Sequence, residues 1–376
     1  MSSVKLSTAQ RPGTQSLLVS RELDRLLSAR DEQVARYGPE FARLWQHARA
    51  RAIGGKLLRP RLLLGAFDAL SQARESAAIA EQATAVRMAA MTEILHYSFL
   101  LHDDVIDGDL SRRGQLNLIG AVLEDRVRHV SRPGQFLADD RERRDLHWAK
   151  TSGILMGDLF LAIAHQIVAR EALPADARLR MLDLLDHTIV ESIAGEHLDV
   201  GLSTGAVSAS PGAVLRMSQL KTATYTFEFP LRTAAILASA PPRVDHILGK
   251  IGRALGLAFQ LQDDLLSTFG QPDEHGKDAF SDLREGKETA LIAHARGTAE
   301  WPHIASRLGR QELHVEECRD LRDRLRACGA ERAVATLITE QVAECEEICA
   351  AEAAVLPPAL TQFISELVTE LDGRRT

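Results

Sequence analysis

The sequence predicts an all-α protein, and two observations indicate this class. Apolar residues recur at helical spacing along most of the 376 residues, and no run of alternating apolar and polar residues typical of strands occurs. The composition, 45% hydrophobic and 26% charged, is that of an ordinary globular protein. We expect a flexible tail at residues 1–16 and a single domain over residues 17–376.

The expected helices follow one another with breaks at Gly and Pro. Helical spacing covers residues 20–50, 61–70, 73–101, 148–171, 174–202, 213–240, 243–269, 286–298 and 311–371. The stretch IGGKLLRP, Ile53–Pro60, predicts a turn followed by a helix start. Residues 203–212 form a Ser/Gly/Pro linker. Residues 121–146 are highly charged around Pro133 and Gly134, which predicts a loop that could act as a flap.

Bulk composition excludes several classes of function. The net charge of −7 and the low aromatic content argue against a nucleic-acid partner. The first fifteen residues lack the apolar core of a leader, and we expect no transmembrane segment because no uninterrupted apolar run approaches about 18 residues. The four cysteines match no zinc pattern and suit core packing as free thiols. Free thiols fit a reducing cytoplasm, so we expect a cytoplasmic location.

A cluster of aspartates follows the apolar stretch Met88–Leu101. Asp103 and Asp107 are four residues apart, so a helix carries them on one face, and Asp104 lies beside them. Carboxylates crowded together repel each other unless a cation neutralises them. Hard oxygen ligands suit Mg²⁺, which completes its shell with water and substrate phosphate. Taken alone, the motif could equally be a solvated acidic helix end.

A second aspartate pair and a set of basic residues strengthen the metal interpretation. Asp263 and Asp264 end another apolar helix, in FQLQDDLLSTFG. Two helices that end in facing carboxylates could hold a Mg²⁺ cluster. The chain has only seven lysines, and four of them stand in short motifs: Lys56, Lys221, Lys277 and Lys287. Three arginines stand in the same motifs or directly after the first aspartate cluster: Arg59, Arg112 and Arg113. Arg and Lys bind phosphate oxygens, so the ligand is a small polyanion, most simply a diphosphate.

The ordered motifs resemble those of the trans-isoprenyl diphosphate synthases, the polyprenyl synthetase family. From Ile53 to Thr289 the chain contains GGKxxRP, DDxxD with a trailing RRG, KT, FQxxDD followed by GK, and DLxxGKxT. The resemblance implies an isoprenoid synthase helical bundle around a deep central cavity, three Mg²⁺ ions and a homodimer. The implied reaction is Mg²⁺-dependent head-to-tail condensation of isopentenyl diphosphate with an allylic diphosphate.

The resemblance also assigns roles residue by residue. The implied metal ligands are Asp103, Asp104, Asp107, Asp263 and Asp264, and the implied catalytic residues are Asp103, Asp104, Lys221 and Asp263. The allylic diphosphate would be held by Arg112, Lys221 and Lys277, with Lys287 at the mouth of its site. Isopentenyl diphosphate would be bound by Lys56, Arg59, His96 and Arg113. Thr222 and Gln260 match positions near the reacting carbons.

The chain departs from the family pattern at two positions, and the first of them, Ser267, keeps an alternative open. Ser267 replaces the third aspartate of the second motif, and Glu196 in GEHLDV stands where glutamine is usual, three residues before Asp199. Asp263, Ser267 and Gln271 have the spacing of the metal triad of class I terpene cyclases, which share the fold. A cyclase is therefore one alternative, and a non-catalytic regulatory subunit is another. The intact first motif and the retained isopentenyl site favour the prenyltransferase.

Product length is expected to depend on the helix before Asp103. In the family the growing prenyl tail runs down this helix. Ser98 is small, whereas Phe99 is bulky, and Leu95 and Met91 continue the stripe of Ser98 at helical steps. A small residue above larger ones predicts a pocket of intermediate depth. We expect C20 geranylgeranyl diphosphate, with the C15 product next.

Overall fold

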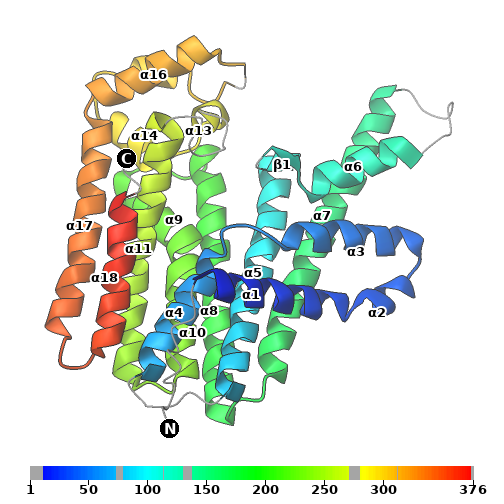
Figure 1. The fold of residues 1–376 in the computed structure, drawn as a ribbon. Coiled ribbons are helices and arrows are strands. Elements are labelled where there is room, and N and C mark those ends of the chain that lie inside the picture. Colours follow the sequence, from blue (N-terminus) through cyan, green and yellow to red (C-terminus); the bar gives the residue numbers. More distant parts are fainter. Residues whose placement is uncertain are drawn as a thin grey trace, which may run out of the picture. The chain divides into compact units, whose positions relative to one another are not determined.

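The computed structural model describes residues 12–72, 79–112, 114–129, 138–270, 280–310 and 312–373 (Figure 1). In these ranges almost all regular structure is helical, which confirms the all-α prediction. The one sheet among the described residues is a hairpin of two-residue strands, in which Ser111 pairs with Leu116 and Arg112 with Gln115. The helices agree in position with most of the expected ranges.

The chain divides into two compact units, each built from two stretches of sequence. Unit 1 comprises residues 1–64 and 77–182, and unit 2 comprises residues 65–76 and 183–376. Helix α4 (Leu58–Gln72) and helix α8 (Ala175–Ser203) each contribute residues to both units. The expected single domain over residues 17–376 stays a prediction.

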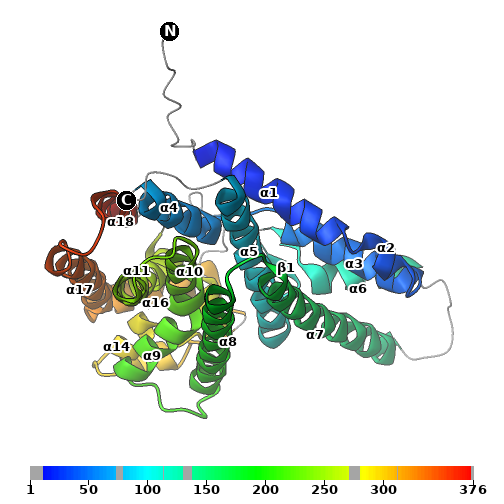
Figure 2. The same cartoon turned by 90° about the horizontal axis from the view of Figure 1, so that it is seen from below.

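Unit 1 is organised around two long helices that pack side by side. Its elements are α1 (Pro12–Ser28), α2 (Asp31–Ala35), α3 (Pro39–Ala52), α5 (Ile79–Asp107), β1 (Ser111–Arg112), β2 (Gln115–Leu116), α6 (Leu118–His129) and α7 (Ala138–Arg170), with the first parts of α4 and α8. Helix α5 packs along α7 and α1 (Figure 2). Phe160 of α7 lies between two other rings, 5.7 Å from Trp45 and 5.0 Å from Tyr97 between centroids. This buried aromatic cluster joins α3, α5 and α7.

Helix α7 passes a simple test for a membrane span. Among the described residues, one helical stretch, Asp140–Arg170, is long and apolar enough to cross a bilayer by length and composition. Its apolar window has a mean hydropathy of 1.5 and is 44% buried inside the structure. This stretch differs from the expectation drawn from the sequence, in which small and polar residues interrupt the apolar run. Core helices of globular proteins pass the same test, and α7 packs on α5 and α6, so this is weak evidence for a membrane segment.

Unit 2 is organised around α11 (Pro242–Phe269). Its other elements are α9 (Pro211–Ser218), the π-helix η1 (Gln219–Glu228), α10 (Phe229–Leu237), α13 (Ser281–Glu285), α14 (Ala290–Ala295), α15 (Trp301–Ala305), α16 (Val315–Ala327), α17 (Ala330–Ala351) and α18 (Pro358–Gly373). Helix α11 packs against η1, and it also packs against α10 and α17, which lie beside it in Figure 2. Most of its residues between Val244 and Asp264 are buried.

Glycines let two helices approach the π-helix closely. A Cβ added at Gly252 of α11 would lie 2.6 Å from Glu228 Cα, and one at Gly256 would lie 2.5 Å from Ala223 Cα. On α8, a Cβ at Gly195 would lie 2.3 Å from the backbone nitrogen of Lys221. These distances are too short for any other residue, so backbone packs directly on backbone. The close packing fixes the position of η1 from both sides.

Two sequence predictions about loops are wrong for the described residues. Residues 121–129 and 138–146 belong to α6 and α7, so the expected loop at 121–146 is helical there, and residues 130–137 lie outside the described residues. Charged side chains had suggested a loop, but they are accommodated on exposed helix surface, as in the i, i+4 pair of Arg128 and Glu124. Residues 12–16 of the expected tail begin α1. The four cysteines are free thiols, and three of them are buried.

The glycine contacts give a test of the fold. Gly252→Ala should lower the free energy of unfolding by about 1–3 kcal/mol, because the added methyl group forces α11 away from η1. Gly212→Ala is the matched control, since no atom lies within 4 Å of the Cβ it would add in α9. Urea unfolding measures both variants. Equal midpoints for the two variants would contradict the proposed packing.

Candidate active site

The first aspartate cluster lies at the C-terminal end of α5, in unit 1. The helix ends at Asp107, where Gly108 adopts a φ of +76° that favours glycine. Asp103 and Asp107 project from the same helix face one turn apart, and Asp107 is exposed. Asp104 points elsewhere and is only 3% exposed. The exposed face of this helix end therefore presents two carboxylates, with a third buried beside them.

Arg112 is held against these carboxylates. Its Nη2 atom donates to Asp104 Oδ1 at 2.7 Å and to Asp103 Oδ2 at 3.3 Å, and its Nε donates to Asp104 Oδ1 at 3.0 Å. Burial raises the pKa of Asp104, and the Arg112 charge opposes this shift. The guanidinium group thus reduces the repulsion among the carboxylates, as a metal ion also would. Arg113, the next predicted residue, lies outside the described residues.

The hairpin that carries Arg112 is anchored by Asn117, a residue to which the sequence analysis gave no role. Its Nδ2 donates to Asp109 O at 2.7 Å, and its Oδ1 accepts from the Gly120 backbone at 2.9 Å. Asn117 is 5% exposed and immediately precedes α6. Asparagine before a helix is a recognisable capping signal, and it could have predicted the start of α6.

Two of the residues assigned to isopentenyl diphosphate, Lys56 and Arg59, lie in and directly after the turn that precedes α4. Gly54 and Gly55 have φ values of +135° and +94°, a conformation that explains the double glycine. The turn exposes Lys56, whereas Arg59 in the first turn of α4 is 9% exposed. Arg59 Nη1 lies 3.9 Å from Glu93 Oε1 of α5.

The third of these residues, His96, is half-buried on α5. It lies seven residues before Asp103, two helical turns along the same face. Lys56, Arg59 and His96 all belong to unit 1, together with the first aspartate cluster.

The residues predicted to set product length occupy two sides of α5. Ser98 is fully buried, and its hydroxyl donates to Gly157 O of α7 at 3.0 Å. Leu95 and Met91 lie on this side and are also buried. Phe99 lies four residues before Asp103, on the face that carries the exposed carboxylates, and is partly exposed. The role of all four residues in product length stays a prediction.

In unit 2, the π-helix carries Lys221 towards two carboxylates of α8. Lys221 Nζ lies 2.6 Å from Asp199 Oδ2 and 2.8 Å from Glu196 Oε2. Glu196, where the family usually has glutamine, therefore gives the ammonium group a second charged partner. The sequence predicted an ordinary helix here, but the structure has a π-helix, a feature often found at functional sites.

A hydrogen-bonded series joins the π-helix to the second aspartate pair. Thr222 Oγ1 donates to Gln260 Oε1 at 2.8 Å, and Gln260 Nε2 donates to Asp264 Oδ1 at 2.8 Å. Burial raises the pKa of Asp264 to about 7, with the nearby charge of Asp282 as the next cause. Asp263 is more accessible than Asp264. The series holds Thr222 and Gln260 together, and their position near the reacting carbons stays a prediction.

The remaining predicted cations are only partly described. Lys287 Nζ pairs with Glu285 Oε2 at 2.9 Å, and both side chains are about one-third exposed. Glu285 and its neighbour Arg284 end the short helix α13, and Arg284 Nε donates to Leu313 O at 3.3 Å. Lys277 and Gln271 lie outside the described residues.

The donor set fits Mg²⁺ chemically. Asp103 and Asp107 offer carboxylate oxygens from one helix face, and the buried Asp264 carboxyl group lies in an acidic environment. Within the ranges that the structure describes, no three His, Cys, Asp or Glu side chains already converge as a metal site. Mg²⁺ needs only one or two protein carboxylates when substrate phosphates and water complete its shell.

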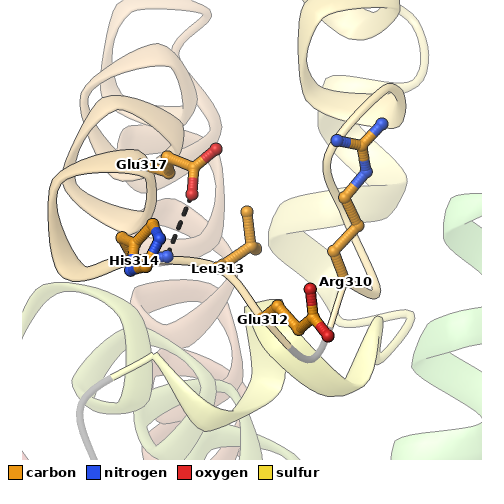
Figure 3. A pocket seen from close by; sticks show the side chains of 5 residues that line it. All are labelled: Arg310, Glu312, Leu313, His314 and Glu317. Atoms are coloured by element: carbon orange, nitrogen blue, oxygen red, sulfur yellow. Dashed lines mark hydrogen bonds between the residues drawn. The ribbon is translucent and has the colours of Figure 1, made fainter.

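One surface hollow in unit 2 contains none of the predicted residues. It has a volume of about 560 Å³ and is lined by Arg310, Glu312, Leu313, His314 and Glu317 (Figure 3). Glu317 accepts from the His314 backbone at 2.9 Å and caps α16. The hollow lies beside the segment that receives the Arg284 side chain, and we assign it no ligand.

Comparison with known proteins identifies the family. The pattern described as polyprenyl synthetase matches residues 43–324. Geranylfarnesyl diphosphate synthase of Aeropyrum pernix is 30% identical over 245 residues, which cover 64% of this chain and 66% of that protein. Geranylgeranyl diphosphate synthase of Methanosarcina mazei is 28% identical over 294 residues, covering 78% of this chain and 79% of that protein.

Among solved structures, geranylgeranyl pyrophosphate synthase from Corynebacterium glutamicum, complexed with isoprenyl diphosphate and magnesium, is similar over 97% of this chain and 100% of its own. The TM-score is 0.85 and the identity 28%. The sequence match thus spans just under two thirds of the Aeropyrum relative, whereas the structural match spans the whole of the Corynebacterium chain. These relatives carry the names of prenyl diphosphate synthases, which are trans-prenyltransferases. The chain belongs to the polyprenyl synthetase family.

Proposed function

We propose that this protein is a Mg²⁺-dependent prenyltransferase that condenses isopentenyl diphosphate with an allylic diphosphate to give a linear trans-prenyl diphosphate. The observation that carries the proposal is the pair of carboxylate clusters at the ends of the apolar helices α5 and α11, one in each unit. Each lies in a setting with fixed cationic or polar side chains, Arg112 in unit 1 and the Thr222–Gln260 pair in unit 2.

The allylic substrate must lose its diphosphate to give a carbocation. Bound Mg²⁺, three ions by the family resemblance, would neutralise the charge that develops on the leaving diphosphate. Asp103, Asp104, Asp107, Asp263 and Asp264 are proposed to hold it. Arg112, Lys221, Lys277 and Lys287 are proposed to bind the same diphosphate, because fixed cations stabilise a developing anion without reorganisation.

Isopentenyl diphosphate supplies the double bond that attacks the cation. Lys56, Arg59, His96 and Arg113 are proposed to bind its diphosphate, and the first three belong to unit 1. After the new carbon–carbon bond forms, a proton leaves the neighbouring carbon, and the released diphosphate is the proposed base. Thr222 and Gln260 are proposed to present polar oxygens near the cation, and their mutual hydrogen bond holds them in one arrangement.

The proposed product is C20 geranylgeranyl diphosphate. Relatives of this chain include geranylgeranyl, geranylfarnesyl and farnesyl diphosphate synthases, so similarity alone leaves the length open. The proposal rests on the small Ser98 above the larger Leu95 and Met91. Phe99, which shares a face with Asp103, would limit the depth of the pocket from above.

Assembly and location are proposed on the same basis. We propose a homodimer, from the family resemblance, and a cytoplasmic location, which the four free cysteines suit.

A product assay tests the function. The purified protein is incubated with Mg²⁺, isopentenyl diphosphate and, separately, dimethylallyl, geranyl or farnesyl diphosphate, and the dephosphorylated products are chromatographed. A single linear prenyl alcohol supports the proposal. A cyclic hydrocarbon formed without isopentenyl diphosphate would assign the chain to the cyclases instead, and no product with any primer would point to a regulatory subunit.

Removing one carboxylate charge from either cluster should abolish most of the activity. Asp103→Asn and Asp263→Asn are each expected to lower kcat by about 10²–10³-fold, because the leaving diphosphate loses a metal-borne charge. Asp183→Asn on the exposed surface of α8 is the matched control and should retain wild-type kcat. Steady-state rates at saturating Mg²⁺ measure the effect. Wild-type rates in both cluster variants would refute the metal assignment.

Smaller side chains on the helix before Asp103 should lengthen the prenyl product. Phe99→Ala removes the bulky side chain one helical turn before Asp103 and is expected to lengthen the main product by at least one isoprene unit. Leu95→Ala and Met91→Ala test the stripe that begins at Ser98, and the same chromatography measures product length. If these two leave product length unchanged, that stripe is not the floor of the pocket.

A further inference from the structure

Ser267 occupies the place where the family's second motif has its third aspartate. It lies four residues after Asp263, on the same face of α11, and is partly buried. Its hydroxyl group is hydrogen-bonded to Asp282 Oδ2 of α13 and lies 3.0 Å from Asp264 O. A hydroxyl has one proton to donate, and the bond to a charged carboxylate is the stronger of the two. Ser267 therefore joins α11 to α13.

A second contact with α11 occurs eight residues after Asp282, at Ala290. The Ala290 backbone N–H, at the start of α14, donates to the Asp264 carboxyl group. Between these two contacts, the Lys287 backbone donates to Asp282 O at 3.0 Å. Lys287 therefore lies on a short segment, residues 282–290, that is fastened to α11 at both ends.

The outer side of α13 is fixed as well. Gly309 N donates to Leu283 O at 3.0 Å, and Arg284 Nε donates to Leu313 O at 3.3 Å. Leu313 belongs to the hollow seen in Figure 3. Gly309 and Leu313 thus hold α13 on one side, and two bonds attach it to the end of α11: the side-chain bond between Ser267 and Asp282, and a backbone bond from Phe280 N to Ser267 O at 3.4 Å.

The charge at position 267 decides whether that attachment needs a cation. An aspartate there would place a second carboxylate against Asp282, and Asp264 is already affected by the Asp282 charge. Two adjacent carboxylates repel unless a cation lies between them. Serine replaces this repulsion with a hydrogen bond. The contact between α11 and α13 can then form before any metal binds.

We infer that Ser267 is a positioning residue: through Asp282 it holds Lys287 in place for a diphosphate, and it does so without a metal ion. The role of Lys287 rests on the proposed function, whereas the hydrogen bond and its effect on α13 do not. The substitution of the third aspartate is thus a gain of preorganisation rather than only the loss of a ligand.

Amide hydrogen exchange in the metal-free protein tests the attachment. Ser267→Ala should speed exchange across residues 281–287 by about tenfold, whereas Ser267→Thr, which keeps the hydroxyl, should exchange as the wild type does. Ser267→Asp should speed exchange in EDTA because the carboxylates repel. Ser306→Ala is the matched control, since it removes only a bond from an exposed serine to His303 O within its own turn. Unchanged exchange in Ser267→Ala would overturn the inference.

A double-mutant cycle tests the link to Lys287. With Mg²⁺ and inorganic diphosphate as the probe, calorimetry should show a Kd raised roughly 3–10-fold in Ser267→Ala. The same substitution in a Lys287→Ala background should have little further effect. An equal effect in both backgrounds would contradict action through Lys287.

Two further measurements keep the inference separate from the proposed function. Asp282→Ala removes the Ser267–Asp282 bond from the α13 side. If Ser267→Ala does not fold, Asp282→Ala is measured in its place. In the product assay, Ser267→Ala should raise KM for the allylic diphosphate more than it lowers kcat. If the wild type forms no prenyl product at all, the proposed function fails, while the exchange result still decides whether Ser267 fastens α13.

Discussion

The burial of carboxylates at the ends of two apolar helices is the constraint on which the rest of the structure depends. Asp104 at the end of α5 and Asp264 at the end of α11 are 3% and 5% exposed, and burial raises the pKa of both. A buried charge is costly unless it is compensated. In unit 1 the Arg112 guanidinium supplies the compensation, and in unit 2 Gln260 and the Ala290 N–H supply hydrogen bonds. Both buried carboxyl groups are thus held in place by partners that the structure shows.

The fold and the family were largely predictable because they depend on local pattern. Helical spacing predicted α5 and α11, and the aspartates at i and i+4 follow directly from helical geometry. The scarcity of lysine drew attention to Lys56, Lys221 and Lys287. The double glycine before Lys56 predicted the turn that the structure contains, with positive φ at both residues.

What the sequence did not predict depends on contacts between distant segments. Nothing local at Lys221 indicates a π-helix, and the close approach of α8 and α11 to its backbone depends on Gly195, Gly252 and Gly256. The Ser267–Asp282 bond joins residues fifteen positions apart in the sequence, so the serine alone looked like a lost ligand. The charged residues at 121–146 suggested a loop because charge is typical of both loops and exposed helices.

The most direct test of the account is whether the two carboxylate clusters require a cation to bind a diphosphate. Calorimetric titration of the wild-type protein with inorganic diphosphate, once with Mg²⁺ and once with EDTA, measures this requirement. The account predicts binding with Mg²⁺ and none detectable in EDTA, because the carboxylates would then repel the anion. Equal binding under both conditions, or no binding under either, would contradict it.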